Sequence, residues 1–155
     1  MPNATLRSTA QLDTFQVRGP GLVVLDSTYS VPASTVVGHE VVFARVPTNA
    51  RINGLTRVYN DALGASVTMS FGLKAVSGNF TTSGTALSTA VAVASANVVG
   101  FLPLTDHVSA GRMVWELLGL ASDPGGFADV IGVTAGATTT ATAQDVTMAL
   151  AYTVE

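Results

Sequence analysis

The stretch from residue 40 to residue 73 reads EVVFARVPTNARINGLTRVYNDALGASVTMSFGL, and it decides the fold. It holds three short runs rich in Val, Phe, Tyr and Thr, separated by Pro, Asn, Asp and Gly. In the third run, Val67, Met69 and Phe71 alternate with small or polar residues, and this period of two places apolar side chains on one face of a strand. The pattern predicts half-buried antiparallel sheet.

The same period returns near the far end of the sequence, between residues 144 and 155. Apolar residues occupy every second position there: Val146, Met148, Leu150, Tyr152 and Val154. Thr, Ala and Glu fill the positions between them. We expect this last run to pack with the central block and to close the core.

Turn-forming residues separate the strands. The breaks at residues 47–50 and 60–64 predict hairpin joints, because Asn, Asp and Gly tolerate the backbone conformations of tight turns. The Gly, Ala and Thr residues of 135–143 predict a hairpin loop between a strand at 127–134 and the closing strand. Residues 77–84 predict a polar loop.

Two segments leave room for helix. Residues 86–101 carry apolar side chains at helical spacing, but the AVAV sequence at 90–93 extends equally well as a strand, which is the interpretation we favour. Residues 105–118 predict a short helix, with Thr105 or Ser109 as its cap and Gly119 as its C-terminal stop.

The length of 155 residues fits a single domain. Residues 1–38 hold several prolines and one strand-like run at 21–25, which predicts an extended N-terminal arm. This arm is either a loose terminus with one edge strand or a segment that docks on a neighbouring subunit. For residues 39–155 we predict an all-β fold, an antiparallel β-sandwich of jelly-roll-like type with one short helix near 106–118.

The composition is apolar and sparsely charged. Hydrophobic residues make up 48% of the chain and charged residues 11%, whereas about 25% of residues are charged in typical soluble domains. Charge of either sign keeps proteins apart, so this composition predicts that partner proteins cover much of the surface. The sequence has no Cys, which excludes disulfides, thiolate nucleophiles and cysteine-based metal sites.

Nucleic-acid and membrane partners are not expected. The net charge is -3 and the basic residues are scattered singly, which leaves no basic patch for a phosphate backbone. Residues 86–104 form the one stretch that resembles a membrane span, but Ser, Thr, Asn, Gly and Pro interrupt it. Residues 1–15 lack the positive cluster and apolar core of a secretory signal, so no export is expected.

The sequence predicts no catalytic, cofactor-binding or metal site. His39 and His107 lie outside any metal-binding spacing, and we expect each at the surface or in a turn. Asp106, His107 and Ser109 supply the residue types of a hydrolase triad, but no GxSxG nucleophile motif accompanies them. The acidic residues form no calcium-binding loop, and their spacing leaves open a cation between subunits or a pair of acids that hydrolyses glycosides.

The single tryptophan and three arginines each allow two interpretations. Trp115 lies in the expected helix, where an anchor in the core is favoured over a platform for ligand stacking. Arg45, Arg51 and Arg57 alternate with apolar residues, so they either line a solvated sheet face or pair with acids of a partner. Four glycines match no phosphate-binding motif and are expected in turns and bulges: Gly54, Gly64, Gly72 and Gly78.

A family resemblance comes from the segment MVWELLGLASDP at residues 113–124. It resembles a recurrent segment of small virion proteins of tailed bacteriophages, in which a WELLGL-type helix and a DPG-type turn precede a C-terminal hairpin with an Ala/Thr-rich tip. Residues 127–155 match that hairpin, and residues 42–52 resemble the strand, Pro-turn and strand with which the family begins. The resemblance covers residues 40–155 and leaves the arm outside it.

The resemblance implies a virion structural protein of the head decoration or cement type. Such a protein is not an enzyme, needs no cofactor and is made in the host cytoplasm. It binds the major capsid protein and its own copies on the outer surface of the phage head, as a homotrimer at local three-fold positions, and it stabilises contacts between capsomers. The alternatives are a tail or head-tail joining protein and, from another class, a carbohydrate-binding module on the virion.

Overall fold

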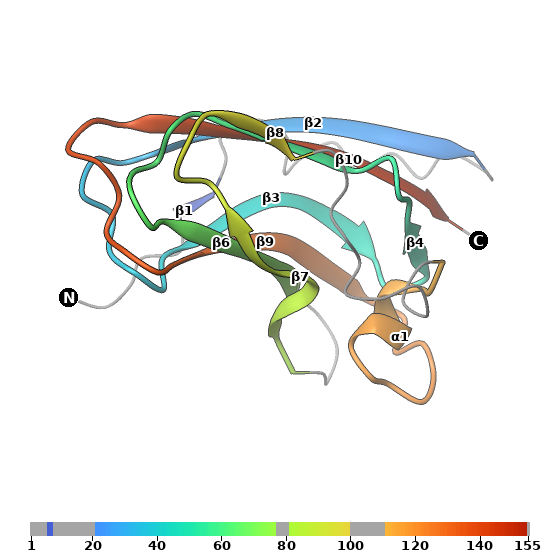
Figure 1. Cartoon of the computed structure of the whole chain (residues 1–155). Coiled ribbons are helices and arrows are strands. Elements are labelled where there is room, and N and C mark those ends of the chain that lie inside the picture. The colour runs from blue at the N-terminus through green and yellow to red at the C-terminus, as the bar shows by residue number, and fades with distance from the viewer. Residues whose placement is uncertain (1–5, 8–20, 77–80, 100–110, 155) are drawn as a thin grey trace.

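The computed structural model describes residues 6–7, 21–76, 81–99 and 111–154, and its strands form two sheets that face each other (Figure 1). The first sheet has the order β1-β3-β9-β6-β7. Its strands are Leu6–Arg7 (β1), Glu40–Pro47 (β3), Phe127–Ala135 (β9), Thr68–Ala75 (β6) and Ser83–Ala92 (β7). The second sheet has the order β2-β10-β5-β8, and β4 also pairs with β10. Its strands are Leu22–Val31 (β2), Gln144–Val154 (β10), Arg57–Asn60 (β5), Asn97–Val99 (β8) and Ala50–Ile52 (β4).

The strand order is that of a jelly roll. Within each sheet the pairs are antiparallel, except that β1 runs parallel to β3. The path β2-β10-β5-β8 interleaves with the path β3-β9-β6-β7, so the chain crosses repeatedly between the sheets, as two nested Greek keys require. The predicted all-β antiparallel sandwich is confirmed, and the strand interpretation of residues 86–101 is confirmed over β7 and β8.

The hairpin joints predicted from turn residues are wrong at three places. The connection at 47–50 joins β3 to β4, the connection at 60–64 joins β5 to β6, and the loop at 135–143 joins β9 to β10. In each case the two strands belong to different sheets. Turn residues predict where the chain reverses, but the packing of the sheets decides whether the returning strand pairs alongside or lies opposite.

Part of the segment predicted as an arm lies in the sandwich. The strand expected at 21–25 extends from Leu22 to Val31, forms the edge of the second sheet and pairs with β10 along its whole length. Tyr29 and Val31 are buried in the core. Residues 6–7 pair with β3 as strand β1 of the first sheet. Residues 1–5 and 8–20 lie outside the described residues, so docking of this segment on a neighbouring subunit stays a prediction.

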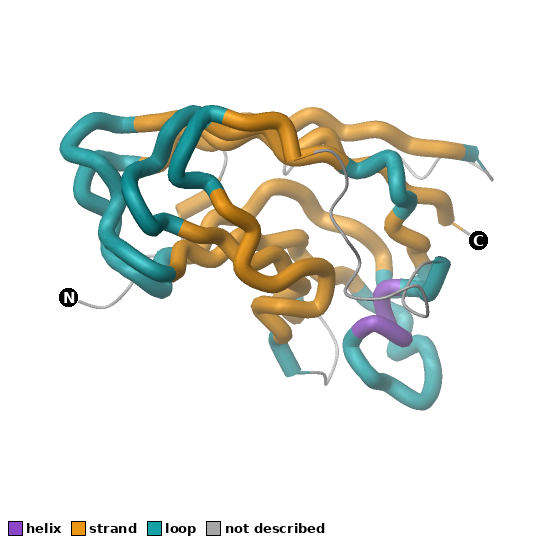
Figure 2. Tube along the Cα trace, in the orientation of Figure 1, coloured by secondary structure: helices purple, strands orange, loops and turns teal. Residues whose placement is uncertain are grey.

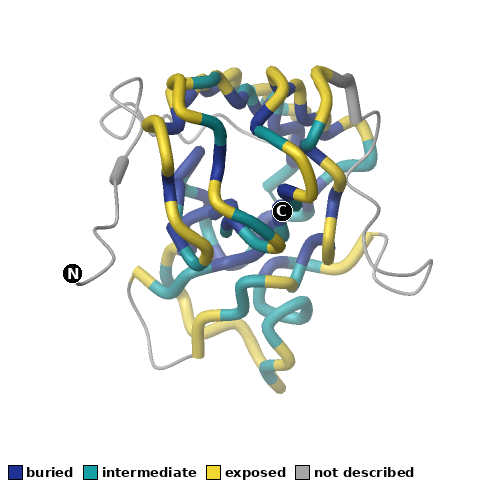
Figure 3. The backbone as a smooth tube through the Cα atoms, turned by 60° about the vertical axis from the view of Figure 1, so that its left-hand side comes forward, coloured by how far each residue is buried: buried dark blue, intermediate teal, exposed yellow. Residues whose placement is uncertain are grey.

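The core fills the space between the sheets (Figure 3). Buried and more exposed positions alternate along β2, β4 and β5, whereas β3, β6 and β9 contain runs of three or more buried residues. The side chains at 67, 69 and 71 are fully buried, as their alternation predicts, and so are those at 146 and 148. Phe43 and Phe71 lie with their ring centroids 6.1 Å apart. A Cβ atom added to Gly132 would lie 2.7 Å from Met69 Cε and 2.9 Å from Phe43 Cε2. Gly132 therefore leaves the space that these side chains occupy.

The helix is shorter than residues 105–118. Helix α1 spans Val114–Leu117, and the Glu116 carboxylate accepts a hydrogen bond of 2.7 Å from the Met113 amide at its start. Met113 itself has extended backbone and forms an isolated β-bridge with Arg51, so the helix begins after it, at Val114. Gly119 adopts a φ of 73° and ends the helix as predicted. Residues 100–110, with Thr105 and Ser109, lie outside the described residues.

Trp115 is not the core anchor that the sequence predicts. Helix α1 has a single turn, and Val114 is its one fully buried residue. The indole is half-buried at the rim of the sandwich, where Nε1 donates a hydrogen bond of 3.0 Å to Met113 Sδ. Across the described residues, no helix has the length and apolar character needed to span a membrane.

Candidate functional site

The described residues bring together no chemical constellation. Among them, no three His, Asp or Glu side chains gather in a way that would hold a metal ion. His39 follows the turn at residues 37–38 in the connection from β2 to β3, but it is buried, with 8% of its surface exposed, so the expectation of a surface position is wrong. Burial lowers the pKa of His39, and the nearby Glu40 carboxylate partly offsets this effect. Asp106, His107 and Ser109 lie outside the described residues.

The outer face of the first sheet carries a buried ion pair. Asp129 on β9 is 3% exposed, and it lies between Arg45 on β3 and Lys74 on β6 in the register of the sheet. Arg45 Nε donates to Asp129 Oδ1 at 2.8 Å and Nη2 to Oδ2 at 3.3 Å. The hydrogen bond with Asp129 raises the pKa of Arg45. Arg45 thus pairs with an acid of its own chain.

A small apolar cluster lies beside that ion pair. Val42 and Ile131 are register partners on β3 and β9, and both are buried although neither belongs to the core between the sheets. Lys74 Nζ donates to Glu40 Oε2. Lys74 lies in the row of paired residues on one side of Val42 and Ile131, and Glu40 lies in the row on the other side. The ion pair therefore crosses over these two apolar residues. Much of this face is therefore occupied by the chain's own side chains.

The start of β7 also lies over this face, because Gly72 has no side chain there. A Cβ atom at Gly72 would collide with the backbone of Ser83 and Gly84 at the start of β7. The pairing of β6 with β7 shifts register between Phe71 and Leu73, on either side of this glycine. The expected role of Gly72 in a bulge is confirmed.

Loops gather at one end of the sandwich (Figure 2), and threonine side chains tie them together. Thr134 Oγ1 accepts a hydrogen bond of 3.0 Å from the His39 amide and donates one of 2.9 Å to the Val36 carbonyl. Thr139 Oγ1 accepts a bond of 2.8 Å from the Thr35 amide. Thr134 near the end of β9 and Thr139 in the Ala/Thr-rich loop therefore hold the connection between β2 and β3 in place.

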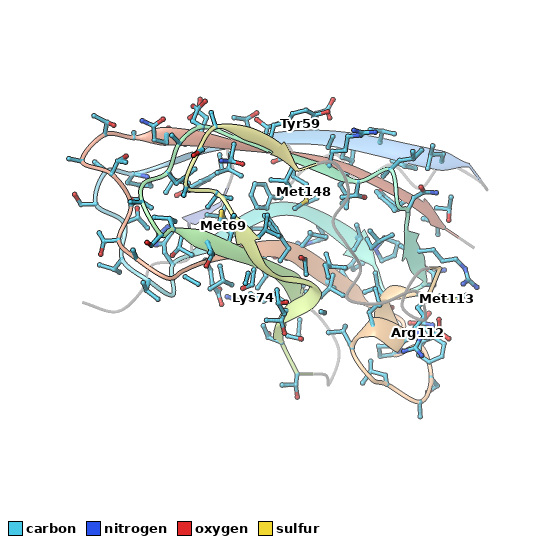
Figure 4. The ribbon with its side chains drawn as sticks, viewed as in Figure 1. Tyr59, Met69, Lys74, Arg112, Met113 and Met148 are labelled. Carbon is cyan, nitrogen blue, oxygen red and sulfur yellow. The ribbon has the colours of Figure 1, made fainter. Side chains whose placement is uncertain are left out.

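The outer face of the second sheet differs from that of the first, because its central side chains are small and large apolar side chains lie around them. Leu22 and Val24 on β2 are 50% and 56% exposed, and Tyr59 on β5 is 40% exposed. Tyr59 lies on the outer side of this sheet (Figure 4). Between them β10 presents Thr147 and Ala149 at outward positions of the register. This face is therefore a candidate for contact with a partner.

The three arginines separate in the structure. Arg45 forms the ion pair with Asp129, and Arg51 donates a hydrogen bond to the carbonyl oxygen of Gly111. Arg57 is exposed on the outer face of the second sheet. For Arg57, both interpretations therefore stay open: a position on a solvated sheet face, or an ion pair with an acid of a partner.

Comparison with solved structures shows the same fold in two bacteriophage capsids. A chain in the cyanophage Pam1 capsid asymmetric unit superposes with a TM-score of 0.62 at 20% sequence identity, covering 100% of both chains. A chain in the capsid of Ralstonia phage GP4 superposes with a TM-score of 0.71 at 14% identity, covering 98% of this chain and 99% of that one. The three chains share one fold. No protein-family model matches the sequence, and no curated protein matches it either.

Proposed function

We propose that this chain is a non-enzymatic structural protein of a bacteriophage virion, of the capsid decoration type. The observation that carries the proposal is the extent of the structural similarity, since the fold covers the whole of this chain and of two chains from solved phage capsids. A likeness confined to part of the chain would fit any protein that contains a jelly roll, because this fold serves many functions.

The surface chemistry supports the same proposal. Charged residues make up 11% of the chain, and the outer face of the second sheet exposes Leu22, Val24 and Tyr59. Such a surface gains stability when a neighbouring protein covers it, at about 25 cal/mol for each Å² of apolar area removed from water. In this proposal the partners are the major capsid protein and further copies of the chain, assembled as trimers at local three-fold positions on the outside of the head.

Binding to phage heads tests the proposal directly. Purified heads that lack this protein are mixed with the recombinant chain, separated from free protein by sedimentation, and imaged by electron cryomicroscopy. We expect saturable binding, density on the outer surface of the head at three-fold positions, and heads that withstand a higher temperature than untreated heads. Density confined to the tail or to the head-tail junction would overturn the decoration proposal in favour of a joining protein.

A second variant tests the arm. Deleting residues 1–20 leaves β2 intact, because β2 begins at Leu22, and removes from the first sheet only the two residues of β1 at its edge. If the arm docks on a neighbouring subunit, the shortened chain keeps its fold by circular dichroism but occupies fewer positions on the head. Unchanged occupancy would contradict a docking role for the arm.

A further inference from the structure

One row of the second sheet carries an unpaired acid and an unpaired base on either side of a small residue. In the register of the sheet, Ala149 on β10 lies between Asp26 on β2 and Arg57 on β5. Asp26 and Arg57 are both exposed, and neither forms an ion pair with another described residue. Because neighbouring strands lie about 4.8 Å apart, the two backbone positions are separated by about 10 Å. The two charges form no ion pair with each other in the structure, so both are available to a partner.

The rows on either side of this row also carry different side chains on β2 and on the β5 side of β10. Thr28 and Tyr59 flank Thr147, and Thr28 Oγ1 lies 2.8 Å from Thr147 Oγ1. In the row beyond, Val24 on β2 pairs with Ala151 of β10, and the loop of residues 53–56 lies on the opposite side of β10. That loop carries Leu55, which is 55% exposed. Each row therefore differs between its β2 side and its β5 side.

We propose that this face is a self-complementary docking surface for a second copy of this chain, related to the first by a two-fold axis that runs along β10. An axis over Ala149 places Asp26 opposite the second copy's Arg57, and Arg57 opposite the second copy's Asp26. The same rotation sets Thr28 opposite Tyr59 and Val24 opposite the loop that carries Leu55. The ion pair and the apolar contact therefore each form twice, as an isologous interface requires.

The charge pattern selects this axis over the other two-fold arrangement of the same faces. An in-plane axis perpendicular to the strands would bring Asp26 against its own copy and Arg57 against its own copy. Like charges placed opposite each other disfavour association strongly. The axis along β10 also keeps the strands of the two copies nearly aligned, which is the geometry that packed sheets prefer, with an angle of about 30°.

The area of the face fits a weak contact. The four strands of the path have 10, 11, 4 and 3 residues, and at about 3.3 Å per residue and about 4.8 Å between strands they cover about 440 Å². This is about half of the roughly 800 Å² per partner of a standard interface, and falls in the size range of weak or transient ones. Small side chains at Ala149 and Thr147 allow the two sheets to approach closely. The outer face of the first sheet offers no comparable surface, because Lys74, Glu40 and the start of β7 cover it.

A charge-swap experiment on the full-length chain tests the proposal. Sedimentation velocity over a concentration series measures self-association of the wild type, Asp26→Arg, Arg57→Glu and the double variant D26R/R57E. We expect each single variant to weaken self-association at least about tenfold, since like charges then face each other. The double variant reverses both pairs and should return to within about threefold of the wild type. Added salt should weaken the wild type and the double variant alike.

A mismatched double variant supplies the control. Arg112 is exposed beside α1, away from β2 and β5 (Figure 4). Arg112→Glu alone should leave self-association unchanged, and D26R/R112E, which has the same net charge as D26R/R57E, should remain as weak as D26R. If copies also form trimers, the same comparison is made between hexamers and trimers.

Two results would overturn the proposal: single variants that associate like the wild type, or a double variant D26R/R57E that stays as weak as its parents. Recovery in the double variant also excludes misfolding as the cause of the losses. The proposal stands on the geometry of one face and not on the proposed function, so charge-swap recovery and head binding succeed or fail separately. A face that instead binds the capsid would lose head occupancy in the single variants without recovery in the double variant.

Discussion

Replacing Gly132 with alanine tests the packing between the sheets. The new Cβ would lie 2.7 Å from Met69 Cε, 2.9 Å from Phe43 Cε2 and 3.3 Å from Phe71 Cε1. The methionine end can swing aside, but the two rings pack against each other at 6.1 Å and must move together. Overpacking a dense core costs about 1–3 kcal/mol, and removing a glycine from a strand returns about 0.5–1 kcal/mol. We therefore expect Gly132→Ala to lower the free energy of unfolding by about 1–2 kcal/mol.

Thermal and urea denaturation measure this loss, which corresponds to a melting temperature lower by about 2–8 °C for a chain of this size. Gly84→Ala is the matched control, since its Cβ would meet only Val133 Cγ2, at an ordinary contact distance of 3.5 Å. It should change stability by less than about 0.5 kcal/mol or raise it slightly. The packing argument fails if Gly132→Ala and Gly84→Ala melt at the same temperature.

Three further substitutions probe the buried polar groups and the bulge. The pKa of His39 is lowered from 6.5 in the folded chain, so below pH 6.5 the unfolded chain binds the extra proton and stability declines as the pH falls. His39→Gln should flatten this decline in urea titrations between pH 7 and 5, and an equally steep decline in the variant would contradict the assignment. Asp129→Ala leaves Arg45 without its carboxylate, but 27% of the Arg45 side chain reaches solvent. The expected loss is therefore about 2 kcal/mol, below the 3–5 kcal/mol of a fully buried pair; a loss under about 0.5 kcal/mol would show that water replaces the pair. Gly72→Ala forces the backbone of Ser83 away from β6, and we expect a loss of at least about 3 kcal/mol, with hydrogen exchange at β7 faster than in the wild type.

The covered first face and the open second face have different consequences for assembly. On the first sheet, the Lys74–Glu40 ion pair and the start of β7 close over Ile131 and Val42. On the second sheet, exposed Val24 and Tyr59 lie near two unpaired charges. In the proposed assembly the second face contacts the neighbours, and the first face is closed by the chain's own side chains.

Several features of the fold follow from short-range patterns. The alternation at residues 67–71 and 146–152 correctly predicts which side chains enter the core, because a strand directs successive side chains to opposite faces. Gly119 ends the helix at its predicted place, since a left-handed residue there satisfies the last carbonyl groups. The strands at 40–47 and 127–135 match the runs predicted near 40–46 and 127–134.

Other features depend on partners far away in the sequence. Asp129 lies within an apolar run, and its burial is possible because Arg45, 84 residues earlier, lies beside it in the sheet. Trp115 is large and apolar, as a core anchor would be. Helix α1 is a single turn at the rim, however, and it begins only after Met113, which forms a β-bridge with Arg51. His39 follows a turn, but it is buried, and its amide donates a hydrogen bond to Thr134 on β9, 95 residues later.

The sequence by itself determined the class of the protein: strands, their inward and outward positions, the sparse charge and the absence of cysteine chemistry. Tertiary structure alone decided which strands share a sheet. It thereby placed Asp26 and Arg57 on either side of Ala149 in β10. The physical reason is the sequence separation of the residues that set each feature. Alternation along a strand is set by the geometry of adjacent residues, whereas register and sheet membership are set by hydrogen bonds and packing between segments that the chain brings together only on folding.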